Sequence, residues 1–191
     1  MIVRFAGFGG QGIVLSSYIM GKSAVSDGKK AIQNQSYGSE SRGGECRGDV
    51  VISHEDIFEL EPISYDVLVA MTQPGYTKFI ADLKPGGMLI VDSDLVATDA
   101  AREAERIAKH ALPATDIAFK KFGRKIIANM IMLGYMNAFL NLVTTESLEK
   151  AVAESVPKGT ADINLAAFRE GMALASGESS STADRVSKSQ E

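Results

Sequence analysis

A glycine-rich turn near the amino terminus constrains the fold more than any other feature of the sequence. The segment Gly7-Phe8-Gly9-Gly10-Gln11-Gly12 follows an apolar strand predicted at 2–6 and precedes a helix predicted from Ile13 to about Asp27. Its glycines permit a positive φ and a close approach of the backbone to a ligand, and the start of the helix favours an anion. The alternative is a tight turn that only packs the helix against the strand.

The rest of the first half also alternates apolar strands with helices. Four further strands are predicted, at 30–35, 49–53, 65–71 and 88–92, and Pro74 opens a short helix between the last two. Beyond Ser93 we expect helices alone, at 100–110, 115–122, 125–143, 145–156 and 161–175. The predicted fold class is α/β: a Rossmann-like three-layer fold with a mostly parallel sheet and a helical C-terminal half.

Composition limits the partners and the compartment. The chain has 20 basic and 24 acidic residues and a net charge of −4, which gives no general reason to expect nucleic acid or an anionic membrane as a partner. No secretory signal opens the sequence, so we expect a cytoplasmic protein. The apolar stretch 126–143 contains three asparagines and barely reaches the length of a membrane span, which favours a helix that is buried or lies at an interface.

The composition of the chain changes near residue 177. We expect a single domain over residues 1–176. From Gly177 onward the sequence has almost no apolar side chain to bury, so the segment 177–191 is predicted to be a disordered tail.

A second glycine-rich segment, 35–48, follows the strand predicted at 30–35. It contains Arg42 and Arg47, whose guanidinium groups suit phosphate or carboxylate recognition. We expect this strand to be the parallel neighbour of the strand before the glycine turn, which puts both loops at the same edge of the sheet, where together they could line one cleft. A solvated loop with surface arginines is the alternative. Cys46, which precedes Arg47, is a candidate for a reactive thiolate.

The sequence offers no self-contained catalytic set. An NAD-binding fold usually has an acidic residue at the end of its second strand, and this chain has Gln33, Asn34 and Gln35 there. The two histidines are far apart in the sequence, and one cysteine cannot form an internal disulfide or hold an iron–sulfur cluster or a structural zinc by itself. We therefore predict no catalytic residue and no metal site in this chain.

Three segments together resemble one known family. They are Gly7-Phe-Gly-Gly-Gln-Gly-Ile, then Ser36-Tyr-Gly-Ser-Glu-Ser-Arg-Gly-Gly with Asp49-Val-Val-Ile-Ser, and finally Asn129-Met-Ile-Met-Leu-Gly. In this order and spacing they are similar to the gamma subunit, or gamma domain, of 2-oxoacid:ferredoxin oxidoreductases. The resemblance covers about residues 1–175. Many relatives have proline where this chain has Ser39, which suggests a less rigid loop here.

The resemblance implies a subunit that is not active alone. Its complex would oxidatively decarboxylate a 2-oxo acid to an acyl-coenzyme A and reduce ferredoxin, with 2-oxoglutarate favoured and pyruvate or 2-oxoisovalerate open. Thiamine diphosphate, magnesium and the [4Fe-4S] clusters would belong to alpha, beta and delta-type partner subunits, and this chain would hold no cofactor alone. It would help to bind coenzyme A as substrate and close the active site.

The same resemblance assigns the coenzyme A contacts to the two glycine-rich segments. The expected residues are Gly7, Gly9, Gly10, Gln11, Gly12, Ser36, Tyr37, Gly38, Arg42, Gly43 and Gly44. Two alternatives from other classes stay open. One is a free-standing NAD(P)-dependent Rossmann oxidoreductase, and the other is a purely structural subunit that touches no ligand.

Overall fold

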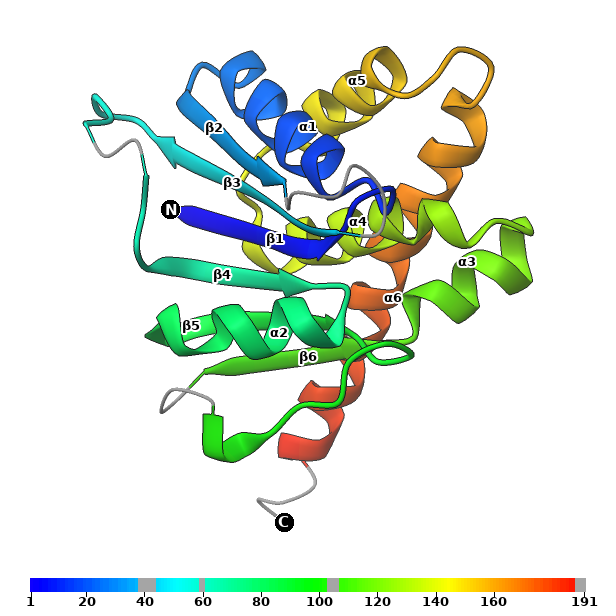
Figure 1. Ribbon diagram of the computed structural model, residues 1–191. Coiled ribbons are helices and arrows are strands. Elements are labelled where there is room, and N and C mark those ends of the chain that lie inside the picture. The colour runs from blue at the N-terminus through cyan, green and yellow to red at the C-terminus, as the bar shows by residue number, and fades with distance from the viewer. Residues whose placement is uncertain (38–43, 59–60, 103–106, 188–191) are drawn as a thin grey trace.

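A six-stranded sheet forms the centre of the computed structural model, which describes residues 1–37, 44–58, 61–102 and 107–187, without the side chains of 37, 102 and 178–187. The strands are β1 (Ile2–Phe8), β2 (Lys30–Tyr37), β3 (Glu45–Ser53), β4 (Tyr65–Ala70), β5 (Leu83–Asp92) and β6 (Ala108–Leu112). Their spatial order is β2-β3-β1-β4-β5-β6 (Figure 1). β1, β4, β5 and β6 pair in parallel, so the carboxyl ends of these strands lie at one edge of the sheet.

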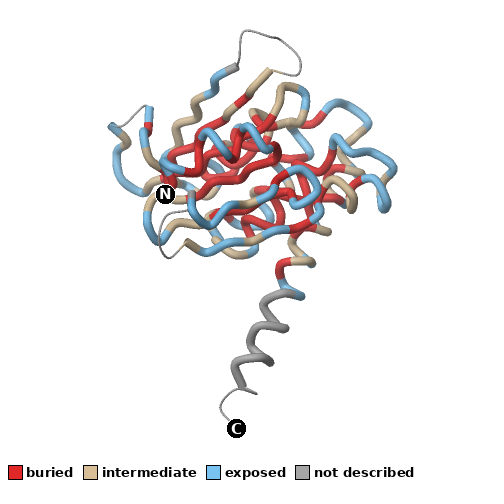
Figure 2. Tube along the Cα trace, turned by 60° about the horizontal axis from the view of Figure 1, so that its bottom comes forward, coloured by how far each residue is buried: buried red, intermediate tan, exposed pale blue. Residues whose placement is uncertain are grey.

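Helices cover both faces of this sheet. They are α1 (Ile13–Ser26), α2 (Gln73–Phe79), α3 (Ala114–Phe122), α4 (Ala128–Leu140), α5 (Thr145–Ser155) and α6 (Ala161–Ser187). The larger apolar core joins one face of the sheet to α1, α4, α5 and α6, and the smaller one joins the other face to α2. Figure 2 shows the buried strands between these layers. The predicted α/β class with a mostly parallel sheet is confirmed.

The prediction that the first two strands are neighbours in the sheet is wrong. β3 lies between β1 and β2 and is antiparallel to both, with Arg4 opposite Asp49 and Asn34 opposite Asp49 in the two ladders. β2 and β3 form a hairpin, because β2 continues to Tyr37 and β3 already begins at Glu45. The loop predicted at 35–48 is therefore shorter. β1 and β2 still point the same way, and their carboxyl ends share one edge.

The helix predicted at 100–110 is also wrong. A short 3₁₀ turn covers Ala100–Arg102, and Ala108–Leu112 forms β6, which adds a parallel strand beside β5. The ring of His110 on this strand lies 4.1 Å from that of Phe139 in α4, measured between centroids. Five residues carry too little periodicity to distinguish strand from helix, and the exposed edge of β5 decides the outcome by offering backbone partners.

The helix predicted at 125–143 is divided into a 3₁₀ turn and α4, and most of it is buried within this domain. A 3₁₀ turn at Lys125–Ile127 precedes α4, and residues 128–137 of α4 are all buried. The Nδ2 group of Asn137 donates to the Val143 carbonyl at 2.9 Å, so this buried amide is hydrogen-bonded, as expected. In the described part of the chain, no helix is both long and apolar enough to cross a membrane.

The last helix is longer than the sequence analysis predicts. The backbone of α6 is helical over Ala161–Ser187, whereas the apolar pattern ends near Ala175. Its buried side chains include Ala167, Phe168 and Ala175. Residues 188–191 lie outside the described part of the chain. The domain boundary at 176 and the disordered tail stay predictions.

Asp27 connects the end of α1 to the start of α5. Its carboxylate accepts the backbone N–H of Thr144 at 2.6 Å, the Thr144 hydroxyl at 2.7 Å and the Ser147 hydroxyl. Burial acts to raise the pKa of Asp27, but these hydrogen bonds outweigh it and lower the pKa below the ordinary value for Asp. The ionised carboxylate therefore stabilises the folded state.

Asp27→Ala should lower the free energy of unfolding at pH 7 by about 1 kcal/mol, the usual effect of losing a capping side chain. Because the folded-state pKa is lowered, the contribution is complete above the ordinary pKa of Asp and is lost as the pH falls through the lowered value. Denaturant unfolding over a series of acidic buffers should show the two proteins converging in acid. A difference that is the same at every pH would refute the role of the charge.

Candidate functional site

The glycine-rich turn between β1 and α1 has the backbone conformation that its sequence predicts. Gly10 has a φ of 100° and Gly12 a φ of 75°, both in the left-handed region that favours glycine. A Cβ atom on Gly12 would lie 2.2 Å from Nδ2 of Asn129. That Nδ2 group donates to the Gly12 carbonyl at 3.2 Å and lies 3.3 Å from the Ser16 hydroxyl. Two of the three segments that carry the family resemblance, those that begin at Gly7 and at Asn129, therefore meet in the fold. Through this contact α4 fixes the start of α1.

Gln11 closes the turn from inside. Its Oε1 atom accepts the backbone N–H of Phe8 at 2.7 Å, and its Nε2 group donates to the Met71 carbonyl just after β4 at 3.2 Å. The side-chain amide thus fills the inside of the loop where the pyrophosphate of a dinucleotide would approach the start of α1. This arrangement ties the carboxyl ends of β1 and β4 together and disfavours a pyrophosphate bound in the NAD manner.

The two glycine-rich segments meet, as their shared edge predicts. The Gly9 N–H donates to the Gly44 carbonyl at 2.9 Å, so this N–H is already used by the protein. Gly10 and Gly12 show no acceptor for their N–H groups in the described part of the chain. Ser36 is exposed near the end of β2, and the Tyr37 backbone pairs with Cys46. Of the other predicted site residues, Gly38, Arg42 and Gly43 lie outside the described residues.

Arg47 does not join the glycine turn. It lies on the face of the sheet that α2 covers, where it lines a hollow with Arg4 and Lys78. Its Nε atom is 4.0 Å from Oδ2 of Asp49, which also holds Arg4. Side chains alternate between the faces of a strand, so Cys46 and Arg47 must point to opposite sides. The hypothesis that Arg47 and the glycine turn bind the same phosphate therefore has no support in the geometry.

Cys46 is not the reactive thiolate that its neighbours suggest. Its side chain is buried under α1, with 3% of its surface exposed. Burial raises the pKa of this thiol above its ordinary value, although the Val14 N–H partly offsets the effect. A buried thiol with a raised pKa is largely protonated at neutral pH and behaves as a small apolar side chain. The hypothesis of a reactive Cys46 is wrong for this conformation.

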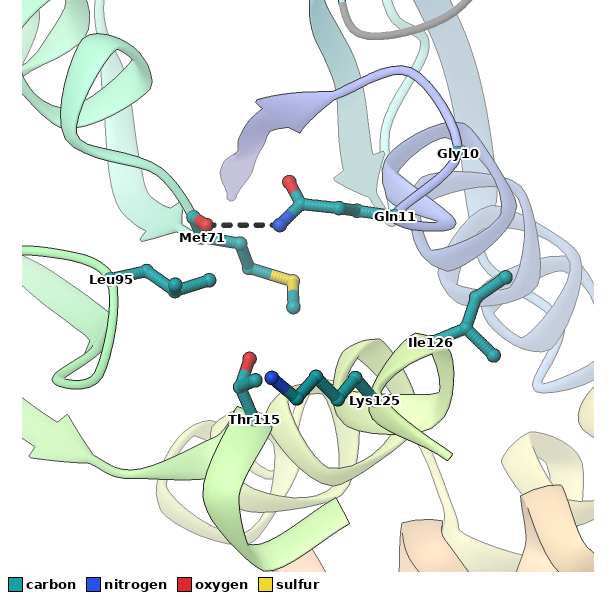
Figure 3. Close-up of a pocket in the computed structure, with 7 residues that line it drawn as sticks. All are labelled: Gly10, Gln11, Met71, Leu95, Thr115, Lys125 and Ile126. Atoms are coloured by element: carbon teal, nitrogen blue, oxygen red, sulfur yellow. Dashed lines mark hydrogen bonds between the residues drawn. The ribbon is translucent and has the colours of Figure 1, made fainter. Parts of the chain in front are cut away.

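A pocket of about 320 Å³ opens beside the glycine turn at the carboxyl edge of the sheet (Figure 3). It is lined by Gly10, Gln11, Met71, Leu95, Thr115, Lys125 and Ile126. These residues follow β1, β4, β5 and β6 or come from the 3₁₀ turn before α4. The position is the one at which open α/β sheets bind their ligands. The lining is mostly apolar and carries one cationic side chain, Lys125.

Asp92 fixes the polar wall of this pocket. It is fully buried at the end of β5, and its Oδ2 atom accepts the Thr115 hydroxyl at 2.5 Å and the Thr115 N–H at 3.1 Å. Burial raises the pKa of Asp92, and the bonds from Thr115 and from the Asp94 N–H act against it. Because the Thr115 hydroxyl donates to Asp92, its oxygen is left as an acceptor for a ligand or for Lys125, whose ammonium group points toward it in Figure 3.

Five of the seven lining residues were not predicted as site residues from the sequence. Met71 ends the strand predicted at 65–71 and Leu95 follows the strand predicted at 88–92, so the sequence could have placed both at the carboxyl edge. Thr115 follows β6, which the sequence pattern did not reveal, and Lys125 and Ile126 were counted in a continuous helix. No group of three or more His, Cys, Asp or Glu side chains suited to a metal ion occurs among the described residues.

The sheet order and the glycine turn define a Rossmann-like α/β domain, with a candidate ligand site at the carboxyl edge of the sheet. The domain can be assigned further by comparison with known proteins. The model of the family described as pyruvate ferredoxin/flavodoxin oxidoreductase matches residues 2–174. The chain therefore belongs to this family, and the resemblance to its gamma-type chains is confirmed.

Relatives with known names cover nearly the whole chain. The 2-oxoglutarate synthase subunit KorC of Methanocaldococcus jannaschii is 45% identical over 174 residues, which are 91% of this chain and 92% of the relative. The KorC subunit of Methanothermobacter marburgensis is 43% identical over 90% of this chain and 95% of its own length. The crystal structure of a keto/oxoacid ferredoxin oxidoreductase gamma subunit from Geobacter sulfurreducens is 40% identical, covers 92% of this chain and 98% of its own, and has a TM-score of 0.80.

A more distant structure shares the fold. It is a 2-oxoglutarate:ferredoxin oxidoreductase from Magnetococcus marinus with 2-oxoglutarate, coenzyme A and succinyl-CoA bound. The match has a TM-score of 0.82 at 23% identity and covers 93% of this chain but 31% of that one. In that enzyme the equivalent of this domain is therefore one part of a longer polypeptide.

Proposed function

We propose that this chain is the gamma subunit of a 2-oxoglutarate:ferredoxin oxidoreductase. The observation that carries the proposal is the 45% identity to a 2-oxoglutarate synthase subunit over nearly the full length of both chains. More distant relatives include subunits of ketoisovalerate oxidoreductase and pyruvate synthase, so the family acts on several 2-oxo acids. Three 2-oxoglutarate synthase subunits are 42–45% identical to this chain, against 36% and 30% for these two relatives, which favours 2-oxoglutarate as the substrate.

The role of this chain within the complex is to help bind coenzyme A and close the active site. The pocket beside the glycine turn is lined mostly by apolar side chains and includes Lys125, features that suit a ligand with a long flexible arm and phosphate groups. Gly10 also lines this pocket. Met71, Leu95 and Ile126 would contact the arm, and Lys125 would attract the phosphates.

The companion subunits supply the chemistry that this chain lacks. In the proposed complex, alpha, beta and delta-type subunits hold thiamine diphosphate, magnesium and [4Fe-4S] clusters, and ferredoxin accepts the electrons. Thiamine diphosphate supplies the carbon centre for decarboxylation, and the clusters carry single electrons. The residues of this chain orient coenzyme A and exclude water from the path between the subunits.

The substrate is tested on the complete complex. The tagged chain is purified from its host with its companions, and the eluate is assayed for coenzyme A-dependent reduction of a low-potential dye with 2-oxoglutarate, pyruvate, 2-oxoisovalerate and indolepyruvate. We expect the highest kcat/KM with 2-oxoglutarate. A higher value for another of these acids would contradict the substrate assignment, and a single colourless chain without activity would contradict the proposed complex.

Lys125→Ala should raise the KM for coenzyme A in the assembled enzyme about tenfold, because a charge-assisted contact to phosphate contributes on the order of 1.5 kcal/mol. The KM for the 2-oxo acid should stay within twofold of wild type. The matched control is Lys158→Ala, which removes the same charge from the exposed turn after α5. Equal KM values for coenzyme A in wild type and Lys125→Ala would argue against this pocket as the coenzyme A site.

Two other functions are separated by simple measurements. A free-standing NAD(P)-dependent oxidoreductase would bind NADH in isothermal titration. The Gln11 side chain inside the turn and Gln33, Asn34 and Gln35 in place of an acid near the end of β2 disfavour this binding. A purely structural subunit would respond to Lys125→Ala with no kinetic change and to substitutions in the glycine turn with loss of assembly alone.

A further inference from the structure

The rim of the pocket is formed by a strongly basic segment with exposed apolar side chains. We call residues 119–126 the basic turn: Phe119-Lys-Lys-Phe-Gly-Arg-Lys-Ile126 runs from the end of α3 into the 3₁₀ turn before α4. We propose that the basic turn and Leu95 form a docking surface for an acidic segment of a companion subunit, with apolar residues at its centre, which covers the mouth of the pocket. This inference rests on the proposed function, because it assumes that the chain works within a complex.

Exposed apolar side chains gather at this rim. Phe119 is 54% exposed, Ile126 is 62% exposed and Leu95 is 39% exposed. Ile126 and Leu95 both line the pocket mouth, and the Nζ atom of Lys125 lies 5.6 Å from the centre of the Phe119 ring. Leu95 and Ile126 thus lie at the opening, and the Phe119 ring lies next to Lys125, which also lines it. Large apolar side chains in water cost little singly, but a group of them around a pocket is typical of a contact surface.

The positive charge of the basic turn indicates that the partner surface is negatively charged. Four of its eight residues are Lys or Arg and none is acidic, in a chain with a net charge of −4. Lys120 pairs with Asp116 at 2.8 Å and Lys121 with Glu170 at 2.5 Å. Arg124 and Lys125 form no ion pair with a carboxylate within the described ranges of the chain. Arg124, next to the apolar group, therefore lacks a counter-charge that an acidic partner surface would supply, whereas the charge of Lys125 serves the ligand of the pocket.

The backbone holds this surface in a defined position. Gly123 ends α3 with a φ of 71°, and the chain then turns into the 3₁₀ segment at Lys125–Ile127. α3 lies beyond the carboxyl ends of the parallel strands (Figure 1), so the basic turn stands beside the pocket and away from the amino-terminal edge of the sheet. A partner segment seated here covers the pocket without entering it. An aromatic ring and an arginine in such a place are typical centres of binding energy.

The docking surface is tested by binding, separately from turnover. The companion subunits are purified as a complex without this chain, and fluorescently labelled wild-type or variant chain is titrated against them at several salt concentrations. Phe119→Ser and Arg124→Glu should each raise the dissociation constant at least tenfold, and Arg124→Glu should also reduce its salt dependence. Val25→Ser, an apolar side chain of similar exposure on α1, and Lys158→Glu are matched controls and should change it less than threefold.

The nature of the partner is tested by crosslinking in the assembled complex. A photoreactive phenylalanine analogue at position 119 should label a companion peptide that contains Asp or Glu. Labelling of a second copy of this chain, or dissociation constants for both Phe119→Ser and Arg124→Glu within threefold of wild type, would overturn the docking surface. The proposed function fails independently, if the wild-type complex assembles normally but shows no turnover that depends on a 2-oxo acid and coenzyme A.

Discussion

Gly134→Ala and Gly171→Ala should each destabilise the protein by about 3 kcal/mol or prevent folding, the largest effect we expect from a single methyl group. The two glycines lie where α4 crosses α6. A Cβ atom on Gly134 would be 2.0 Å from the Phe168 carbonyl oxygen, and one on Gly171 would be 2.0 Å from the Ile131 carbonyl oxygen. Both obstacles are backbone atoms inside helices, so the helices would have to separate along their length and lose close packing.

Gly177 in the same helix is the matched control. Apart from the neighbouring backbone of α6, no atom of the described residues lies within 4 Å of the place where its Cβ would stand. Gly177→Ala should therefore leave the stability unchanged or raise it by up to about 1 kcal/mol, because alanine is the better helix former. Thermal unfolding followed by circular dichroism should show a fall in Tm of roughly 10 °C for the crossing variants. A fall of less than 2 °C in both would show that the helices separate easily.

Arg4→Leu should cost about 3–5 kcal/mol, because it leaves a buried carboxylate without its main partner. The Arg4 guanidinium donates to both oxygens of Asp49, at 2.7 and 2.8 Å, and is 2% exposed. It also lies over the Tyr65 ring, 4.4 Å from its centre, and over the Phe79 ring at 4.9 Å. The pair links β1 to β3, the strand that the sequence analysis did not place between β1 and β2.

A double variant separates the charge effect from the packing effect. Arg4→Leu with Asp49→Leu removes both charges and should be more stable than Arg4→Leu alone, since no unpaired ion remains in the core. The exposed pair of Arg169 and Glu149, with Nε and Oε1 2.7 Å apart, is the control. Its removal by Arg169→Ala should change Tm little. If Arg4→Leu and Arg169→Ala behaved alike in urea unfolding, the buried pair would have no special role.

The sequence predicts the elements that have long or regular apolar patterns. It fails for segments whose structure depends on the strands with which they pair. β1, α1, α5 and the start of α2 at Pro74 follow from apolar runs and end signals. β6 does not, because Ala108–Leu112 is short and becomes a strand only beside β5. The position of β3 between β1 and β2 also depends on tertiary contacts. A strand can pair along either of its two edges, and the sequence of the strand alone does not show which strands it pairs with.

The glycine turn of the candidate site could be predicted, but its use could not. The positive φ values of Gly10 and Gly12 agree with the sequence pattern. The pattern cannot show that Gln11 folds back onto Phe8 and Met71, because this depends on where β4 ends in space. Arg47 belongs to the loop predicted at 35–48 but lies in β3, on the same face of the sheet as Asp49, because β3 begins earlier than its apolar residues indicate.

The measurement that tests the account most directly is reconstitution of the complex with and without this chain. Companion subunits purified without it are assayed for 2-oxoglutarate-dependent reduction of ferredoxin, and purified chain is then added back over a range of concentrations. We predict that coenzyme A-dependent turnover is lost without the chain and returns, saturating at a fixed stoichiometry, as it is added. Full coenzyme A-dependent turnover in its absence would contradict a gamma subunit that helps to bind coenzyme A and close the active site.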